Sequence, residues 1–547
     1  MNIKTLLGST ALAVILSGCD SGGVTLAPSN NVSNSNNTTN TGTTPAAPVV
    51  NPCASYQKSG QTIQGTLSGA NCIYPNTFVS DTNPLSADLT INELANNGIH
   101  IFEDSLFVGQ DVNANAAAQG VKVPQDGEGP DLVLAPGVKI AFSNPEDYIR
   151  INRGSRIIAD GTRTKPIILS AIKDLRDKQA TEADRGLWGG LVINGNGLTN
   201  KCTDAERQAT ASNPHNCHVT TEGRPSTYGG NNNAENSGVL RYVQVRYAGF
   251  EVVDGDELNG ITFNGVGSGT TVEYVQVYTT QDDGYETFGG AVSFKNIVAV
   301  NVGDDYLDFS EGWVGDVQFA LFVITSGGNR CVEADNTGDT RPDDVAPYTK
   351  GRISNMTCIV TDVDAGQGQF PSTKGDAEGP LYREGSYFEQ YNSITVASTA
   401  TMASNECFEI ESAQSIAGIG SGFSVARGNL VACSEALKAV SSFNIRDWWT
   451  TSGNVVVNEA ARLPVTALKG LGAANPRAYI TAPAFTDATG AAITVPVYDV
   501  TQLRDSWQAR AVPAVGAAGS SSFFQKVDFI GAVKDGQDWV SGWTTGL

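Results

Sequence analysis

The stretch that decides the fold is residues 271–309, TVEYVQVYTTQDDGYETFGGAVSFKNIVAVNVGDDYLDF. An acidic triplet within it recurs after twenty-two residues: Asp282, Asp283 and Glu286, and then Asp304, Asp305 and Asp308. The frame around the triplet repeats at the same step, in Tyr274-Val275, Asn296-Ile297 and Gln318-Phe319. A fixed step of this length is typical of a coiled repeat, in which each turn of the chain is one unit stacked on its neighbours.

Short runs of β-branched residues, separated by Gly, Asn and Asp, continue this pattern on both sides of the stretch. They begin at Tyr148. Residues 240–245 and 272–277 are near copies of each other. No amphipathic helix of about 10–15 residues alternates with these runs, which argues against βαβ units, and the leucine-rich repeat template is absent. We therefore predict an all-β protein with a right-handed parallel β-helix, and a propeller or a sandwich is the alternative.

The composition divides the 547 residues into five predicted parts. Residues 1–18 are a lipoprotein signal peptide, and residues 19–52 are a lipidated cysteine followed by a disordered tether rich in Ser, Asn, Thr and Gly. The other three parts are an N-terminal entry or cap region, the parallel β-helix and a C-terminal cap region, at residues 53–147, 148–443 and 444–547. We expect short helices at residues 85–96, 111–119 and 506–509. A C-terminal cap is expected because the terminal repeats of solenoids need an atypical outer face.

The N-terminus predicts export and lipidation. Lys4 precedes a largely apolar run, Leu6–Leu16, that is too short to span a bilayer. The run ends in Leu16-Ser17-Gly18-Cys19, which resembles the lipobox of bacterial lipoproteins and so implies cleavage before Cys19 and its acylation, including palmitate. An ordinary signal peptide with a chance cysteine is the alternative. We expect a lipid-anchored protein of the cell envelope, at the outer membrane and exposed at the surface, although Asp20 can favour the inner membrane in enteric bacteria.

Eight further cysteines suggest four disulfide bonds, because an even number in an exported chain favours pairing. The simplest pairing follows the sequence: Cys53 with Cys72, Cys202 with Cys217, Cys331 with Cys358, and Cys407 with Cys433. Eight cysteines allow about 105 connectivities, so this pairing is one hypothesis among many. No C-x-x-C motif occurs, so redox catalysis is not indicated.

The charge balance excludes several classes of function. The chain has 35 basic and 57 acidic residues, a net charge of −22, and therefore lacks the basic footprint that nucleic acids require. Three histidines leave little for zinc, haem or histidine acid–base chemistry. Acidic excess suits solubility and cation binding, and Ca²⁺ is the only cofactor that the residues suggest.

The repeated acidic triplets are the candidate metal site. If the coils stack like strands of a sheet, equivalent carboxylates lie about 4.8 Å apart and repel by about 1 kcal/mol even in water. Such a stack needs either full solvation or a bound cation, and Ca²⁺ takes six to eight oxygen ligands. We expect all six carboxylates as ligands, with Glu333, Asp335 and Asn336 of the next coil to complete the set. In an extended segment, Asp283 and Asp305 would point away from the other four. A solvated acidic stripe is the alternative.

Several motifs together resemble a family of uncharacterised bacterial envelope lipoproteins with predicted β-helix folds. The motifs are RGLWGGLVING (185–195), SGVLRYV (237–243), ELNGITF (257–263), GVGSGT (265–270), DDGYETFGG (282–290), FFQKVDFIGA (523–532) and GWT (542–544). The resemblance implies a fold and a compartment, and it assigns no activity.

The residues leave three kinds of function open. We favour a non-enzymatic surface-interaction protein that binds an extracellular polysaccharide, with Ca²⁺. The first alternative is a polysaccharide-active enzyme. The Asp pairs are similar to those of polygalacturonase-like hydrolases, but the Gly-His-Gly segment of those enzymes is absent and a lyase would need Arg383 or Lys374 as its base. The second alternative is a structural lipoprotein, or an accessory lipoprotein to an outer-membrane transporter; an outer-membrane protein is thus a candidate partner.

Aromatic side chains could also contribute to sugar binding, because their rings can stack on sugar rings. Four aromatic residues in the predicted coils are candidates: Trp188, Tyr228, Tyr247 and Trp313. Aromatic side chains packed in the core of the coils are the commoner case.

Overall fold

The computed structural model of the protein describes most of the chain after the predicted tether. The described residues are 51–253, 256–324, 328–360, 377–397, 406–433, 435–440, 443–457, 491–503, 523–534 and 536–547. Cys19, Lys374 and the helix expected at residues 506–509 lie outside them. Among the described residues, no helix is long and apolar enough to cross a membrane.

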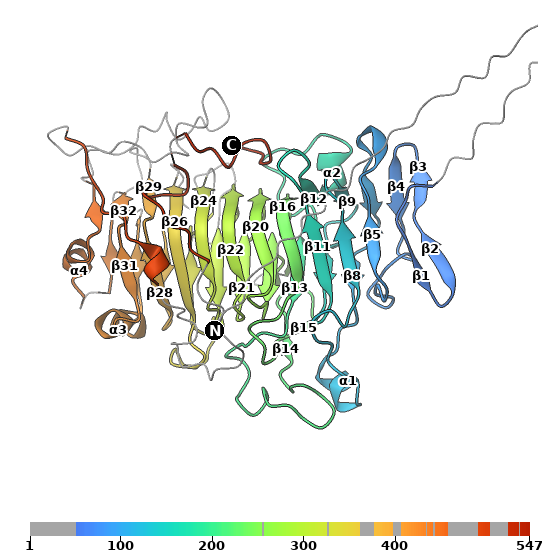
Figure 1. The fold of residues 1–547 in the computed structure, drawn as a ribbon, viewed down its shortest axis with the longest axis horizontal. Coiled ribbons are helices and arrows are strands. Elements are labelled where there is room, and N and C mark those ends of the chain that lie inside the picture. Colours follow the sequence, from blue (N-terminus) through green and yellow to red (C-terminus); the bar gives the residue numbers. More distant parts are fainter. Residues whose placement is uncertain are drawn as a thin grey trace, which may run out of the picture. The chain divides into compact units, whose positions relative to one another are not determined.

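The described chain winds into a parallel β-helix, as predicted (Figure 1). One side of the coils is a ten-stranded sheet in which every neighbouring pair is parallel. Its strands, in order of stacking, are β7 (Leu106–Val108), β10 (Ile149–Ile151), β13 (Leu191–Asn194), β19 (Ile261–Asn264), β21 (Tyr285–Phe288), β23 (Leu307–Ser310), β25 (Glu333–Ala334), β27 (Leu381–Tyr382), β30 (Glu409–Ile410) and β33 (Lys438–Ala439).

The other two sides of the coils belong to one larger sheet, which we call the bent sheet. Five of its strands are long: β16 (Gly238–Arg246), β20 (Thr271–Tyr278), β22 (Ser293–Val300), β24 (Asp316–Ile324) and β26 (Lys350–Val360). Shorter strands continue it on both sides: β3 (Thr66–Ser68), β4 (Asn71–Tyr74), β5 (Leu89–Ile91), β6 (His100–Phe102), β8 (Asp131–Leu134), β9 (Lys139–Phe142), β11 (Arg156–Asp160), β12 (Ile167–Ala171), β28 (Tyr387–Tyr391), β29 (Ile394–Ala397), β31 (Val425–Arg427), β32 (Leu430–Ala432) and β34 (Val455–Val456).

Each long strand bends sharply at one residue with a positive φ. These residues are Tyr242, Tyr274, Asn296, Phe319 and Asn355, with φ of 48°, 54°, 56°, 64° and 57°. A single residue in the left-handed conformation bends the strand, so that one run of sequence contributes to two sides of the coil. Asn tolerates this conformation better than most residues. We call these five positions the bend residues.

The register of the strands departs from the predicted step at one point. The expected step of twenty-two holds between β20 and β22, where Thr271 pairs with Ser293, and between β21 and β23, where Tyr285 pairs with Leu307. It fails between β22 and β24, where Lys295 pairs with Gln318. The turn between β23 and β24 is one residue longer than the turn between β21 and β22. The predicted repeat at Gln318-Phe319 was therefore wrong by one residue.

Parallel stacking begins earlier than Tyr148. β4 pairs with β6 and β6 with β9, while β5 pairs with β8, all in parallel. The helix expected at residues 85–96 was wrong, because that segment holds β5 and a short 3-10 turn, η1 (Ala95–Asn97). The helix expected at 111–119 is confirmed as α1 (Ala114–Ala118), whose first turn is capped by the Asn113 side chain.

The remaining elements lie at the edges and in the insertions. They are the hairpins β1 (Ser55–Lys58) with β2 (Gln61–Gln64), β14 (Val219–Thr220) with β15 (Thr227–Tyr228), and β17 (Glu251–Val253) with β18 (Asp256–Glu257), and the helices α2 (Ile172–Leu175), α3 (Ala413–Ser421), α4 (Ile445–Thr451) and η4 (Val500–Gln502).

The interior of the coils is apolar, and four disulfides cross-link the structure. Residues in register on the ten-stranded sheet, such as Leu191, Ile261, Tyr285 and Leu307, are buried one above another. The structure confirms the four disulfides in sequence order, Cys53–Cys72, Cys202–Cys217, Cys331–Cys358 and Cys407–Cys433.

The last residues return to the middle of the solenoid. We call the described residues 523–534 and 536–547 the C-terminal strap, drawn in dark red in Figure 1. Glutamine side chains of the bent sheet hold its backbone: Gln318 exchanges two hydrogen bonds with Gln525 (2.9 and 2.8 Å), and Gln276 two with Thr545 (2.6 and 2.8 Å). The strap thereby covers part of the bent face.

Candidate functional site

The outward row of the ten-stranded sheet carries carboxylates on three neighbouring strands. In β21 and β23 alternate residues enter the core, so that Glu286 and Asp308 point outward. Glu286 pairs with Asp308 and Asp308 with Glu333 in the register of the strands. Their backbones are therefore one strand spacing apart, about 4.8 Å.

A second stack of side chains precedes these strands, in the turns. The Asn259 side-chain oxygen accepts the N–H of Asp283 at 3.1 Å, Asp283 accepts that of Asp305 at 2.8 Å, and Asp305 accepts that of Arg330 at 2.6 Å. Each side chain thus satisfies the backbone of the equivalent residue one coil further on. The prediction that Asp283 and Asp305 point away from the other carboxylates was wrong, because both lie in turns rather than in extended strands.

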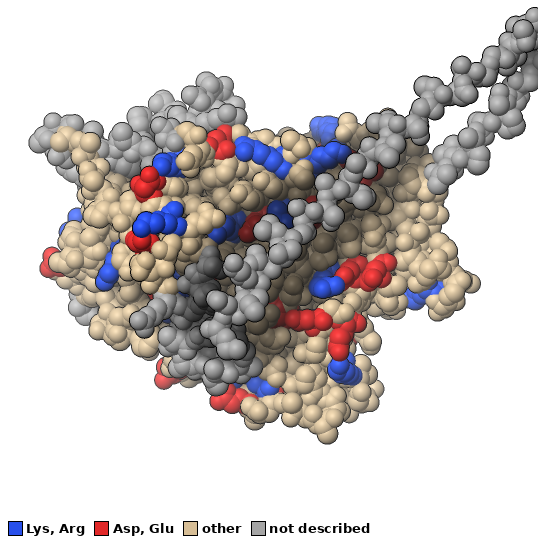
Figure 2. All heavy atoms as spheres, in the orientation of Figure 1, with Lys and Arg blue, Asp and Glu red and all other residues tan. Residues whose placement is uncertain are grey.

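The two stacks meet in two groups of three carboxylates. Ligand oxygens of Asp282, Asp283 and Asp304 lie within 4.8 Å of one another, and so do those of Asp283, Asp305 and Asp308. We call the six carboxylates Asp282, Asp283, Glu286, Asp304, Asp305 and Asp308 the acidic ladder. Four of the six are buried, which is not what a solvated stripe would show. On the face drawn in Figure 2, acidic side chains lie among Lys and Arg rather than in one continuous field.

Burial and mutual repulsion raise the pKa values across the ladder. Burial is the larger cause for Asp283, Glu286, Asp305 and Asp308, whose pKa values lie well above the ordinary range, and the neighbouring carboxylates raise them further. Burial also raises the pKa of Glu333 to about 7. Either protons or a cation must therefore offset the negative charge of the ladder near neutral pH.

An insertion between β13 and β16 brings a further carboxylate to the ladder. The turn of its hairpin β14–β15 places Glu222 beside Glu286, and burial raises the pKa of Glu222 to about 7. Glu222 was not predicted from the sequence, because this residue lies in an insertion outside the repeat.

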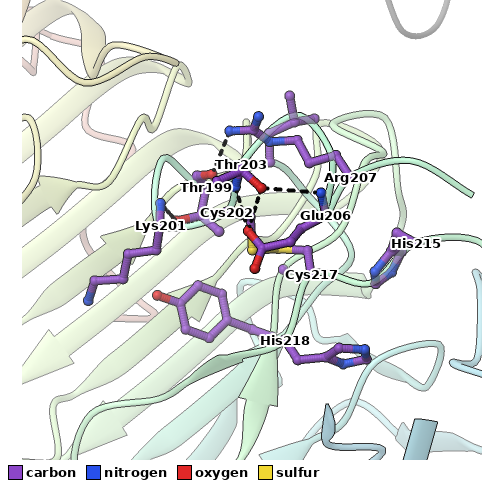
Figure 3. Close-up of a disulfide and its surroundings, with 12 residues drawn as sticks. Thr199, Lys201, Cys202, Thr203, Glu206, Arg207, His215, Cys217 and His218 are labelled. Carbon is purple, nitrogen blue, oxygen red and sulfur yellow. Dashed lines mark hydrogen bonds between the residues drawn. A yellow bond between two sulfur atoms is a disulfide. The ribbon is translucent and has the colours of Figure 1, made fainter. Parts of the chain in front are cut away.

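The Cys202–Cys217 disulfide holds this insertion together (Figure 3). Beside the disulfide, Thr203 donates its N–H and its hydroxyl to Glu206, both at 2.7 Å, and Arg207 donates to the Thr199 carbonyl at 3.1 Å.

Two histidines also lie beside the disulfide (Figure 3). Burial lowers the pKa of His215 to about 3 and that of His218 to about 4. Both rings are neutral at physiological pH and add no positive charge near the ladder.

A family comparison bears on this site. The family described as "Pectate-lyase like beta helix domain" matches residues 122–467, more than half of the chain. The chain belongs to this family. No curated protein matches the sequence, and no solved structure matches it. Membership of this family supports a polysaccharide-related role.

Arg383, which lies in this pectate-lyase-like domain, forms ion pairs with two carboxylates. Its guanidinium donates to Asp335 at 2.9 and 3.2 Å and to Glu333 at 2.6 Å. Burial lowers the pKa of Arg383, but these hydrogen bonds and charges outweigh it and hold the pKa above the ordinary arginine value. Arg383 is therefore unsuited to act as a catalytic base, and Lys374 lies outside the described residues.

The four aromatic residues predicted as candidates for stacking on sugars are buried. Trp188, Tyr228, Tyr247 and Trp313 pack inside the pectate-lyase-like domain and present no open ring face. Trp188 illustrates the reason, since its ring stacks on Phe142 with centroids 4.9 Å apart and its N–H donates to the Arg246 carbonyl at 2.7 Å. Burial of these rings, the commoner case for aromatic side chains, is confirmed, and the alternative of sugar contact is not supported.

A second acidic cluster lies further along the ten-stranded sheet. Ligand oxygens of Glu378, Glu406 and Glu409 lie within 4.8 Å of one another, and all three side chains are buried. Two cations of the protein sit against them: Arg330 pairs with Glu378 and with Glu409 (2.9 Å), and Lys438 pairs with Glu406 (3.1 Å) and Glu409 (2.8 Å). We call this group the glutamate cluster.

Proposed function

We propose that this protein binds an extracellular polysaccharide at the acidic ladder, with Ca²⁺, as a lipid-anchored component of the bacterial cell envelope. The proposal rests on two groups of three carboxylates in the ladder. Within each group, the ligand oxygens lie within 4.8 Å of one another. Membership of the pectate-lyase-like family supports the polysaccharide part of the proposal.

The residues of the ladder fit a calcium ion. Ca²⁺ prefers carboxylate and carbonyl oxygens and accepts irregular geometry. Asp308 Oδ1 is buried and receives no hydrogen bond from the described residues, so this acceptor is available to a cation. Asp282, Asp283, Asp304, Asp305 and Asp308 would hold the ion, and Glu286 and Glu333 flank it. A bound Ca²⁺ would offset part of the negative charge of the ladder and offer coordination positions to sugar oxygens.

Binding is favoured over cleavage by the engagement of the side chains. Asp283 and Asp305 each accept a backbone N–H, which ties both carboxylates to the fold. The proposed lyase base Arg383 is held in two ion pairs. The described residues thus place no unengaged strong base beside the ladder.

A hydrolase is the second candidate, and one observation favours it. Glu222 and Glu333 flank the ladder, and both have a pKa of about 7. A carboxylic acid with such a pKa is protonated often enough near neutral pH to act as a general acid.

A glycan array with Ca²⁺ and with EDTA, followed by a reducing-sugar assay on the hits, tests the proposal. We expect Ca²⁺-dependent binding without release of reducing ends, abolished by Asp304→Asn combined with Asp308→Asn. Glu93→Gln, an exposed carboxylate paired with Lys165, is the control that should bind normally. Release of reducing ends would favour the hydrolase. No binding at all would favour a structural role or an accessory role with an outer-membrane protein.

The anchor is tested separately, because Cys19 lies outside the described residues. We propose that acyl chains on Cys19 hold the protein at the outer membrane, since several chains anchor stably where one does not. Cys19→Ser should release the protein from membranes. Its recovery in the membrane pellet after a high-salt wash would contradict this.

A further inference from the structure

A pocket lies on the bent face, between the long strands and the C-terminal strap. It has a volume of about 520 Å³, within the range of about 300–1,000 Å³ that small-molecule sites occupy. Tyr274, Asn296 and Phe319 line it from the bend positions of three successive strands, and Phe529 and Trp539 line it from the strap. The two sides of the pocket thus come from segments more than two hundred residues apart in the sequence.

Aromatic rings form two of its walls. Trp539 meets Tyr274 edge to face, with centroids 6.2 Å apart and an interplanar angle of 71°. Phe529 stacks on Phe319 with centroids 6.2 Å apart and an interplanar angle of 9°. The Trp539 indole N–H donates to the Ala532 carbonyl at 2.9 Å, which fixes its ring in place. Tyr274 and Trp539 are both only partly buried. One face of Tyr274 stacks on Tyr242 with centroids 4.6 Å apart, so only the rest of its ring is available to the pocket.

Asn296 supplies an amide that has no hydrogen-bond partner among the described residues. Its side chain is 7% exposed and lines the pocket, yet it makes no hydrogen bond with the described residues. The bend residue Asn355 has the same left-handed conformation, but its amide donates to the carbonyls of Phe529 (3.1 Å) and Gly531 (3.2 Å) of the strap. The Asn296 amide is open to the pocket rather than enclosed by the protein, so Asn296 is suited to a polar ligand.

Charged side chains of both signs line the pocket. Lys534 pairs with Asp528 at 2.7 Å, and Lys526 pairs with Asp499 at 2.7 Å. Lys295 donates to the Phe523 carbonyl at 2.5 Å and makes no ion pair with the described residues. Because Glu273 and Asp528 border the pocket together with the lysines, neither a strongly anionic nor a strongly cationic ligand is favoured. Ring surfaces together with an amide match a pyranose, which has an apolar face and hydroxyls around its edge.

We propose that this pocket is a second sugar site, which takes a neutral pyranose of an oligosaccharide and needs no metal ion. Tyr274 and Trp539 contact the sugar ring, and the Asn296 amide donates to and accepts from its hydroxyls. The site lies on the bent face, whereas the acidic ladder belongs to the ten-stranded sheet. Its binding is therefore independent of the calcium-dependent binding proposed above.

Isothermal titration calorimetry of the full mature chain in EDTA tests the site. The ligands are three neutral hexasaccharides, cellohexaose, mannohexaose and xylohexaose, with hexagalacturonate as the charged comparison. We expect a neutral hexasaccharide to bind in EDTA. Asn296→Gly should weaken that binding about tenfold, the equivalent of one lost hydrogen bond, while keeping the left-handed bend that Gly adopts readily. Trp539→Ala should weaken it further.

Two controls separate this site from the ladder. Phe423→Ala removes an aromatic ring that is 45% exposed and lies outside the pocket, and it should bind normally. Asp304→Asn combined with Asp308→Asn should also bind normally in EDTA. Three results would overturn the inference: no neutral hexasaccharide binds in EDTA, binding survives both Asn296→Gly and Trp539→Ala, or hexagalacturonate binds more tightly than the neutral ligands. Binding seen only with Ca²⁺ would overturn this site and leave the ladder proposal standing.

Discussion

The acidic ladder and the glutamate cluster lie on the same sheet of the same solenoid, yet their negative charge is met differently. In the glutamate cluster, Arg330 and Lys438 reach in among three buried carboxylates. In the ladder, the carboxylate oxygens within each of two groups lie within 4.8 Å of one another. The pKa values of four ladder carboxylates are raised well above the ordinary range. The glutamate cluster carries its own cations, whereas for the ladder we propose a bound Ca²⁺.

A single residue position marks the change between them. Asp283, Asp305 and Arg330 are equivalent in successive coils, because each donates its N–H to the side chain one coil before. The first two contribute carboxylates to the ladder. The third contributes a guanidinium that pairs with Glu378 and Glu409. The substitution of one charge for the other at a fixed backbone position separates a candidate metal site from an internal ion-pair network.

The largest expected effect comes from removing the internal cation. Arg330→Met should leave the buried glutamates without their central partner and lower the free energy of unfolding by about 3–5 kcal/mol. Urea unfolding at pH 7 measures this. Lys526→Met, which removes an exposed ion pair, should change it by less than about 1 kcal/mol. Equal losses in the two variants would show that the glutamate cluster does not depend on Arg330.

The next effect concerns the insertion that brings Glu222 to the ladder. Replacing Cys202 and Cys217 with Ala opens a loop of 15 residues and should lower stability by about 3 kcal/mol in the chain-entropy model. We also expect a weaker response to Ca²⁺, measured by the Tm with and without the ion.

The matched control is the Cys407–Cys433 disulfide, which lies beside the glutamate cluster and closes a loop of 26 residues. Its removal should lower stability while leaving the Ca²⁺ response intact. A Ca²⁺ response that is unchanged in the Cys202 and Cys217 variant would mean that the insertion plays no part in the site.

Calcium should stabilise the folded protein, and only through binding at the ladder. Extracellular Ca²⁺ sites have Kd values of roughly 10⁻⁴ to 10⁻³ M, so about 1 mM Ca²⁺ that binds the folded state alone adds about 0.4–1.4 kcal/mol of stability. Millimolar Ca²⁺ should therefore raise the Tm, and Asp304→Asn with Asp308→Asn should abolish the rise. If the parent shows no rise and the double variant is at least as stable, the ladder does not bind the ion.

The smallest effect is a dependence on pH in the absence of metal. A carboxyl group whose pKa is raised by folding contributes stability below its unfolded pKa, about 4, and loses that contribution as pH rises through its folded pKa. The folded pKa is about 7 for Glu222 and Glu333. In EDTA, the Tm of the parent should fall between about pH 5 and pH 8.

The matched comparison for this pH effect is Asp304→Asn with Asp308→Asn, in which fewer carboxylates repel one another. Its Tm should fall less over the same pH range. A Tm that rises with pH in the parent, or that falls equally in both proteins, would contradict the raised pKa values.

The repeat in the sequence was sufficient to predict the solenoid and the stacking of the acidic triplets. The reason is that a parallel β-helix pairs residues one coil apart, so that a fixed step places equivalent side chains in register, as with Glu286 and Asp308. The disulfide pairing also followed the sequence, since each pair joins nearby segments. The lipid anchor on Cys19 remains a prediction.

The sequence did not predict features that depend on contacts outside the repeat. Glu222 reaches the ladder from an insertion, and Trp539 reaches Tyr274 from the C-terminal strap. One extra residue in a turn shifted the partner of Lys295, and Asp283 turned toward the ladder because it lies in a turn.

The sequence by itself thus determined the coil, the twenty-two-residue step between two pairs of neighbouring strands and the identity of the stacked carboxylates. Only the tertiary structure decided which side chains cover them, which cation neutralises the glutamate cluster and where the Asn296 amide faces a pocket. The physical reason is one of range. Periodicity fixes contacts between neighbouring coils, whereas insertions and the strap fold back across many coils and leave no period in the sequence.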